Sequence, residues 1–266
     1  MAKRSISRPR SDTIPAASPS LRLFPILGFP EIRRDDDLAK FIADLAHRAG
    51  IRFEDGDVLV IAQKIVSKAE GSVVRLAAVK PSAKALSIAR RMKKDPRAIE
   101  VILKESRRIV RSDHVLITET HHGFVCANAG VDHSNVPGND VVTLLPRNPD
   151  RSARKLAAAL RKRTGKRVAV IISDTFGRPW RLGLTNVAIG ATGVPVLLDL
   201  RGTCDRHGKL LNATILAVAD ELAAAAGLLM GKSEGSPVVL IRGYHYKPCL
   251  DPASRIIRTA AEDLFR

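Results

Sequence analysis

Residues 168–181 read Val168-Ala169-Val170-Ile171-Ile172-Ser173-Asp174-Thr175-Phe176-Gly177-Arg178-Pro179-Trp180-Arg181. The apolar run at the start predicts a buried strand, and the polar residues after it predict a loop at the end of that strand. The loop contains a carboxylate, a hydroxyl and two guanidinium groups. Oxygen ligands of the first two kinds suit a hard cation, whereas arginine suits phosphate oxygens. This combination indicates metal-assisted phosphoryl chemistry on an α/β scaffold.

A second segment of the chain has the same organisation. Apolar residues 124–127 precede the polar run Asn128-Ala129-Gly130-Val131-Asp132-His133-Ser134-Asn135. A single aspartate at a strand-to-loop turn usually caps the turn and has no further role. Two such turns in one chain, together with the arginines, favour a joint site for Asp132 and Asp174.

The composition suits an α/β protein with an aliphatic core, because 45% of the 266 residues are apolar and 4% are aromatic. No window of about 18 apolar residues occurs, so we expect no transmembrane helix. Residues 1–20 are rich in Ser, Pro and Arg, which predicts a disordered basic tail and no secretory signal. Three cysteines far apart in sequence predict free thiols, and hence a cytoplasmic protein.

The formal net charge of +17 arises largely from two clusters, at residues 90–97 and 151–167. Their spacing places them on the solvated faces of predicted helices. A basic RNA-binding protein is the alternative from a different class, but aromatic residues for base stacking are scarce. A second alternative is another nucleotide-dependent carboxylate–amine ligase or a kinase.

Periodicity and capping residues predict the secondary structure of residues 21–266. We expect strands at 21–27, 58–62, 109–110, 115–118, 124–127, 141–145, 168–172, 187–189, 194–198 and 238–241. We expect helices at 37–49, 82–93, 96–105, 150–163, 214–230 and 254–265, with Ser82 and Ser254 as N-caps. A change in composition at 146–150 suggests a sub-boundary within this module.

Further blocks extend the pattern along nearly the whole chain. They are Gly28-Phe29-Pro30-Glu31-Ile32 with Asp36-Asp37-Leu38, Gly56-Asp57-Val58-Leu59-Val60, Val66-Ser67-Lys68-Ala69-Glu70-Gly71, Ala219-Asp220-Glu221-Leu222-Ala223 and Arg242-Gly243. No block is decisive alone, but all of them in one order are highly specific. From about Leu23 onward the sequence resembles the coenzyme F420-0:L-glutamate ligase family (F420 is a deazaflavin cofactor), in the form without a C-terminal reductase-like domain.

The resemblance implies GTP-dependent ligation of L-glutamate to coenzyme F420-0, with further γ-linked glutamates as an optional extension. An acyl phosphate would be the intermediate, and GDP and phosphate would be released. The resemblance also implies Mg²⁺ or Mn²⁺, with K⁺ as a further candidate cation. The expected fold is a mixed α/β two-domain monomer within an intertwined homodimer, with no nucleic-acid or membrane partner.

The resemblance also assigns roles to residues. Asp132, Asp174 and Thr175 are expected to bind the divalent metal. Lys68, Arg178 and Arg181 are expected to neutralise phosphate or substrate carboxylates. For the two arginines this expectation comes from the chemistry of their motif. Nucleotide contacts are expected at Phe29, Pro30, Glu31, Ile32, Gln63, Lys64, Lys68, Asn135, Met230, Gly231, Lys232, Ser233, Glu234, Gly235, Ser236 and Pro237.

Three other features of the sequence receive plainer interpretations. Gly231-Lys232-Ser233 is not a Walker phosphate loop, because it follows a helix and Ala226 stands where that motif needs glycine. Cys126 is interpreted as a buried inert thiol, because its strand is apolar and no base is nearby in sequence. Asp220 and Glu221 are interpreted as a structural acid pair.

Overall fold

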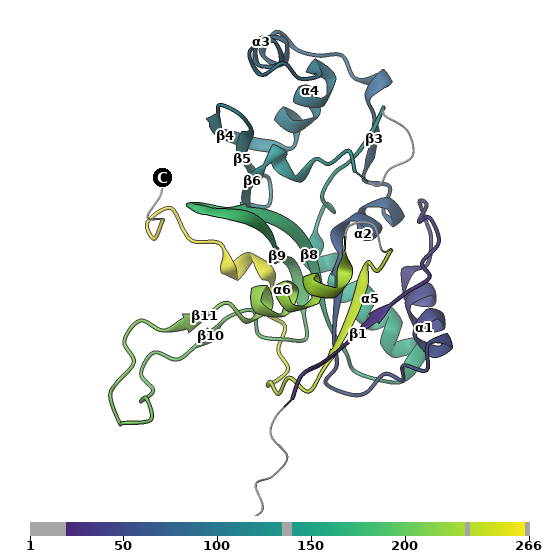
Figure 1. Cartoon of the computed structure of the whole chain (residues 1–266), viewed down its shortest axis with the longest axis vertical. Helices are drawn as coiled ribbons and strands as arrows, with labels where there is room; N and C mark the ends of the chain where they lie inside the picture. Colours follow the sequence, from purple (N-terminus) through teal and green to yellow (C-terminus); the bar gives the residue numbers. More distant parts are fainter. Residues whose placement is uncertain (1–19, 135–139, 232–234, 264–266) are drawn as a thin grey trace, which may run out of the picture.

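The computed structural model describes residues 20–134, 140–231 and 235–263 (Figure 1). The expected tail at 1–20 lies outside these ranges except for Ser20. The helices are α1 (Leu38–Arg48), α2 (Gln63–Ala69), α3 (Ala83–Met92), α4 (Pro96–Lys104), α5 (Pro149–Thr164) and α6 (Val218–Met230). The strands are β1 (Arg22–Ile26), β2 (Val58–Ala62), β3 (Val73–Arg75), β4 (Ser106–Ser112), β5 (Leu116–Thr120), β6 (Val125–Ala127), β7 (Val141–Thr143), β8 (Ala169–Arg178), β9 (Arg181–Thr192), β10 (Leu198–Asp199), β11 (Ile215–Leu216) and β12 (Val238–Arg242).

A five-stranded mixed sheet in the order β1-β12-β2-β8-β9 forms the centre of the molecule. Strands β2 and β8 run parallel, and the other neighbours pair antiparallel. Side chains alternate between the two faces of a strand, so Leu59 and Ile61 pack on one hydrophobic cluster while Val58 and Val60 pack on another. Helices α1 and α5 cover the first face and α6 covers the second. The α/β class expected from the sequence is therefore confirmed.

A third hydrophobic cluster lies in the segment between β3 and β7. Helices α3 and α4 and the three-stranded sheet β4-β5-β6 build it, beyond one end of the central sheet (Figure 1). The chain leaves the central sheet after β2. It pairs β3 with β7 on its return and enters the sheet again at β8, after α5. The sub-boundary expected at 146–150 stays a prediction.

Most of the expected elements are confirmed to within a few residues, and their capping residues act as the sequence indicates. Ser82 accepts a hydrogen bond from the Ala85 amide, and Pro96 occupies the first turn of α4. The basic residues 90, 91, 93 and 94, like 161–163, are exposed on α3 and α5 or at their ends. All three cysteines are free thiols. In the described ranges no helix is long and apolar enough to cross a membrane.

The loop expected after residue 172 is wrong, because β8 continues to Arg178 and turns sharply into β9. Asp174 pairs with Val187 and Thr175 with Asn186 across this ribbon. The ladder of antiparallel hydrogen bonds outweighs the local turn preference of the polar residues, and the turn falls at Pro179 and Trp180. The strand expected at 187–189 is accordingly part of β9, whereas most of the strand expected at 194–198 is irregular backbone before β10, with Val194 and Val196 buried.

Two further expectations about helices are wrong, and one helix was not predicted. The helix expected at 214–230 begins at Val218, because Ile215 pairs with Asp199 in β11. The helix expected at 254–265 is a short 3-10 turn at Ala253–Ile256, and Ser254 is not its N-cap. Tertiary contacts override the helical pattern there, since Ile256 and Ile257 pack on opposite clusters. Helix α2, finally, has no counterpart among the predicted elements.

A buried ion pair joins the loop before β2 to the end of β12. The carboxylate of Asp57, 1% exposed, accepts hydrogen bonds from Arg242 Nε at 2.8 Å and Nη2 at 2.7 Å. It also accepts the Glu54 amide at 2.8 Å, and Arg242 Nη1 reaches the exposed Glu54 carboxylate at 2.6 Å. Two blocks of the sequence, Gly56-Asp57 and Arg242-Gly243, therefore meet in one structural contact.

We predict that Asp57→Asn lowers the free energy of unfolding by about 3 kcal/mol, because it leaves a guanidinium group partly buried without its countercharge. Denaturant titration measures the change. The matched control is Glu54→Gln, which removes the exposed side of the same network and is expected to cost less than about 1 kcal/mol. Equal losses in the two variants would contradict the structural role of Asp57.

Candidate functional site

A cavity of about 1080 Å³ opens at the edge of the central sheet where β2 ends. Parallel strands present their carboxyl ends at the same edge, and here Ala62 of β2 is paired with Ser173 of β8. The antiparallel β12 begins beside them, where the Ala62 amide donates to the Pro237 carbonyl at 2.8 Å. The loop after β1, the start of α2, the turn after β6, the β8–β9 ribbon and the end of α6 complete the walls.

Most of the residues predicted for the site line this one cavity. They are Phe29, Pro30, Glu31, Ile32, Gln63, Lys64, Lys68, Asp132, Asp174, Thr175, Met230, Gly231, Gly235, Ser236 and Pro237. Arg178 and Arg181 are placed differently, exposed where β8 turns into β9, and are not among the described residues that line the cavity. Asn135, Lys232, Ser233 and Glu234 lie outside the described residues.

Helix α2 brings two lysines to the cavity wall. Lys64 and Lys68 are four residues apart and therefore lie on one face of the helix. Lys68, 8% exposed, donates to Glu31 Oε1 at 2.6 Å. Within the helix Ser67 donates to the side-chain oxygen of the buried Gln63 at 2.8 Å, which fixes the amide at the cavity. The ammonium group of Lys68 is thus already paired with an acidic partner at the cavity wall.

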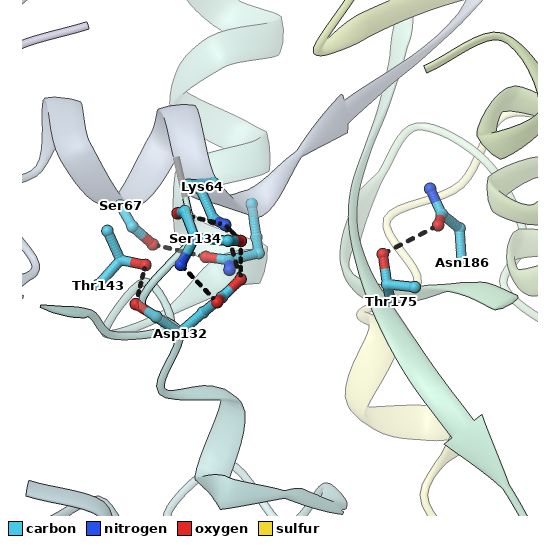
Figure 2. Close-up of polar contacts among 8 residues, drawn as sticks. Lys64, Ser67, Asp132, Ser134, Thr143, Thr175 and Asn186 are labelled. Carbon is cyan, nitrogen blue, oxygen red and sulfur yellow. Dashed lines mark hydrogen bonds and ion pairs between the residues drawn. The ribbon is translucent and has the colours of Figure 1, made fainter. Parts of the chain in front are cut away.

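The carboxylate of Asp132 is held by a compact set of contacts (Figure 2). Lys64 Nζ lies 2.6 Å from Asp132 Oδ2 and 2.6 Å from Ser134 Oγ. The Ser134 amide donates to Asp132 Oδ1 at 2.8 Å, and the Ser134 hydroxyl donates to Oδ2 at 2.8 Å. The backbone of Asp132 is bridged to Thr143 of β7 in both directions. The backbone pairing with Thr143 therefore fixes the position of Asp132, and Lys64 and Ser134 fix its carboxylate.

These contacts keep Asp132 ionised. Burial alone would raise the pKa of its carboxyl, but the hydrogen bonds from Lys64 and Ser134 outweigh burial and lower the pKa overall. A permanently ionised carboxylate paired with a lysine can exchange that lysine for another cation. The Asp132 carboxylate is thus suited to a site where a metal ion and Lys64 alternate.

The opposite wall is formed by the β8–β9 ribbon. The Thr175 hydroxyl donates to the Asn186 side-chain oxygen at 3.2 Å, and the Asn186 amide contacts the Met230 sulfur at 3.4 Å (Figure 2). Because Thr175 uses its proton in this contact, its oxygen lone pairs stay available to a cation. Asp174, one residue earlier, lies close enough to Cys126 to affect that thiol.

Cys126 has the character expected of an inert thiol. Burial, with the neighbouring negative charge of Asp174, raises the pKa of Cys126 to about 12. The group therefore stays protonated near neutral pH and is a poor nucleophile. Cys126 lines the same cavity as Asp132 and Asp174.

Asp220 is structural, as its position in the helix suggested. Its carboxylate accepts the Ala188 amide at 2.8 Å, at the bulge where β9 carries one extra residue opposite β8. Burial raises the pKa of Asp220, against the effect of this hydrogen bond. The contact ties the start of α6 to the ribbon that carries Asp174 and Thr175.

The chemistry of the donor set fits a hard divalent cation. The carboxylates of Asp132 and Asp174 and the hydroxyl of Thr175 line the same cavity, and Mg²⁺ is commonly held by one or two carboxylates together with substrate phosphates. In the described part of the chain no three His, Cys, Asp or Glu side chains are arranged as a complete metal cage. A site of this kind is completed by the ligand that brings the phosphates.

Several cavity residues were not predicted as site residues. Asn128 and Ser134 belong to the quoted polar run, so the signal was present but was assigned to the turn. Asn186 carried no signal, because its role depends on its pairing with Thr175 across the ribbon. Phe176, which packs edge-on against Phe124, likewise reaches the cavity through the unexpected length of β8.

Comparison with known proteins gives a consistent result. The family model described as F420-0:Gamma-glutamyl ligase matches residues 27–243. The chain is 49% identical to the coenzyme F420:L-glutamate ligase of Methanopyrus kandleri over 256 residues, which covers 93% of this chain and 98% of that protein. It is 49% identical to the enzyme of that name from Methanothermobacter thermautotrophicus over 226 residues, 84% of this chain and 89% of that protein. For the Archaeoglobus fulgidus enzyme the identity is 41% over 247 residues, with 92% and 96% coverage.

The Lys64–Asp132 contact predicts a measurable competition. A cation that binds Asp132 in the absence of nucleotide must displace the ammonium group, so Lys64→Met is expected to tighten Mn²⁺ binding about fivefold, the factor that corresponds to about 1 kcal/mol. Titration of free Mn²⁺ by electron paramagnetic resonance measures this affinity. Lys40→Met, which removes an equivalent contact to the exposed Asp44, is the control and should leave Mn²⁺ binding unchanged. Weaker Mn²⁺ binding in Lys64→Met would contradict the competition.

Proposed function

Since the chain belongs to the F420-0:gamma-glutamyl ligase family, we propose that it ligates L-glutamate to coenzyme F420-0 with GTP as the energy source. The observation that carries this proposal is the convergence of five separate segments on one cavity, which unites Asp132, Asp174 and Thr175 with Lys64 and Lys68. The cavity is large enough for a nucleotide together with the reacting ends of two further substrates. Addition of further γ-linked glutamates would use the same site.

The proposed reaction has two steps. A carboxylate oxygen of the acceptor attacks the γ-phosphorus of GTP, the bond from that phosphorus to the β-phosphate oxygen breaks, and GDP leaves. The glutamate nitrogen then attacks the carbonyl carbon of the acyl phosphate, the C–O bond to phosphate breaks, and phosphate leaves with the electron pair. The ammonium group gives up two protons to solvent over this second step, and an amide remains.

Positioning and charge neutralisation are the contributions that such chemistry needs from the protein. Lys68 and Lys64 are suited to phosphate oxygens, since each is a mobile point charge at the end of a flexible stem. Lys68 is the more deeply placed of the two, with its side chain 10% exposed against 16% for Lys64. No side chain is required as a nucleophile, which agrees with the protonated state of Cys126.

Asp132, Asp174 and Thr175 are proposed to hold Mg²⁺ or Mn²⁺. When bound, the ion would supply positive charge to the phosphate oxygens and polarise the transferred group. Lys64 would then pass from Asp132 to a phosphate oxygen. K⁺ is a further candidate cation for the same set of oxygens.

Arg178 and Arg181 are proposed to act at the outer end of the site. They lie at the tip of the β8–β9 ribbon, and the Arg178 guanidinium donates to the Leu182 carbonyl at 3.1 Å. From there they could meet a carboxylate of a bound acceptor tail more readily than the phosphates. Asn135 and residues 232–234 are proposed to contact the nucleotide, as the resemblance implies.

A homodimer is part of the proposal, and the exposed apolar surface supports it. Leu182 is 99% exposed and Leu184 62% exposed on the ribbon, and Leu228 is 85% exposed on α6, which packs beside the ribbon at Asn186. The arm that contains β10 and β11 projects from the body and carries further exposed aliphatic side chains (Figure 1). Large exposed apolar surfaces often mark interaction sites. A second copy of the chain is the proposed occupant.

The function is tested by incubating the protein with GTP, Mn²⁺, glutamate and F420-0 and measuring the product by mass spectrometry. The expected product carries the mass of one added glutamyl unit, or a ladder of such units. Asp174→Asn is expected to reduce turnover at least 100-fold while the protein stays folded, because it removes charge from a site that favours anionic oxygen. Asp44→Asn on α1 is the control. Near-normal turnover of Asp174→Asn at saturating Mn²⁺ would remove Asp174 from the metal site, and an RNA shift without ligation would favour the binding alternative.

The dimer is tested by light scattering in solution. The double variant Leu182→Ser/Leu228→Ser is expected to shift the mass from twice the chain mass toward the monomer, because it removes two fully presented aliphatic anchors. Leu250→Ser changes another leucine, 77% exposed in the segment after β12, and should leave the mass unchanged. A dimer that persists in the double variant would place the interface elsewhere.

A further inference from the structure

The turn after β6 presents a hydrogen-bond acceptor that has no partner among the described residues. Asn128 is half-buried and lines the cavity, and its side-chain oxygen Oδ1 is withdrawn from solvent without a donor. A buried acceptor without a donor is costly, so native proteins keep few of them. Asn128 is not one of the positions expected to touch the metal or the nucleotide.

The backbone at Asn128 is held in an unusual conformation. Asn128, Ala129 and Gly130 have φ values of 53°, 54° and 71°, so three successive residues lie in the left-handed region. Asparagine and glycine tolerate this region, whereas alanine is disfavoured there. The Val131 amide closes the turn on the Asn128 carbonyl at 2.9 Å. A strained turn that carries an unsatisfied side chain into a cavity is typical of a binding position.

The described groups around Asn128 supply no donor to its side-chain oxygen. Asp132 lies four residues later, and its carboxylate already has Lys64. The wall here therefore presents an amide oxygen, which only accepts and still needs a donor.

Among the reacting groups of the proposed substrates, one matches this wall. Carboxylates and phosphates have no proton to donate at neutral pH, whereas the glutamate ammonium has three N–H donors and a positive charge. We propose that Asn128 Oδ1 accepts a hydrogen bond from the amino group of the incoming glutamate and orients its nitrogen toward the acyl phosphate. A rotation about the Asn128 Cβ–Cγ bond, a torsion with a broad energy profile, turns the oxygen into the cavity.

This inference rests on the proposed function and deepens it. The amide of Asn128 has no titratable proton near neutral pH, so it acts as an acceptor and takes no proton from the nucleophile. The nitrogen forms the C–N bond, the C–O bond to phosphate breaks, and the two protons of the ammonium group pass to solvent. Asn128 contributes selection and orientation of the amine, which matter to the second step and not to the first.

The decisive variant is Asn128→Gly, because glycine accepts the left-handed backbone and removes the side chain alone. The KM for glutamate is expected to rise about 10- to 100-fold, the range for loss of a hydrogen bond to a charged group. The KM values for GTP and F420-0 should stay within about twofold. Asn128→Asp keeps both the backbone preference and the acceptor, so its KM for glutamate should remain near that of the unaltered protein.

Inhibition by glutarate, which is glutamate without its amino group, localises the contact. The inhibition constant for glutarate is expected to be the same in Asn128→Gly and in the unaltered protein, so the variant should lose its preference for glutamate over glutarate. Trapping of the acyl phosphate with hydroxylamine should proceed equally in both proteins, since the first step does not use Asn128. Asn212→Ala on the β10–β11 arm is the control for removal of an asparagine outside the cavity.

The outcomes separate this inference from the function on which it rests. If the unaltered protein forms neither the glutamyl product nor the hydroxamate, the proposed function fails. If it forms both and Asn128→Gly keeps its KM for glutamate, the inference about Asn128 fails. An increase in the KM for GTP alone would assign Asn128 to the nucleotide and also overturn the inference, as would weaker binding of glutarate in parallel with glutamate.

Discussion

The parallel pairing of β2 with β8 is the constraint on which the site depends. Ala62 is paired with Ser173. The segment after β2 and the second half of β8 therefore extend beyond the same edge of the sheet. Helix α2 follows the first strand with Lys64 and Lys68, and the second strand continues directly into Asp174 and Thr175. Residues more than a hundred positions apart are thus placed on two walls of one cavity by the hydrogen-bond register of two buried strands.

The sequence predicted those parts of the fold that are set locally or by burial. Continuous aliphatic runs such as residues 58–62 and 238–241 became central strands, and capping residues such as Ser82 fixed helix ends. The failures share one physical cause, which is pairing or packing with distant residues. Residues 174–178 form a strand because β9 lies beside them. The helical turn at 253–256 does not continue, because Asp150 accepts the Ala253 amide and adjacent isoleucines pack on two clusters.

For the candidate site, the charged residues could be recognised from the sequence, whereas the uncharged polar residues beside them could not. Asp132, Asp174, Lys64 and Lys68 belong to blocks whose composition already suggests phosphate and metal chemistry. Asn186 and Asn128 gain their significance from three-dimensional facts, namely a partner across a ribbon and an acceptor without a partner. Arg178 and Arg181 show the opposite case. They are close to Asp174 in sequence and were predicted as site residues, but β8 extends to Arg178 and places both at an exposed tip.

Under the proposed function, the ion pairs of the cavity would couple the binding of metal and nucleotide. Lys64 with Asp132 and Lys68 with Glu31 compensate the charges of two largely buried ammonium groups. A cation arriving alone would have to displace Lys64 from Asp132, and a triphosphate arriving alone would have to draw lysines away from their carboxylates. If both bound together, each lysine would exchange its carboxylate for a phosphate oxygen, Asp132 would contact the metal, and Glu31 would face solvent. Breaking the Lys64–Asp132 pair would then cost free energy once for two ligands, so each ligand would raise the affinity of the other by the same factor.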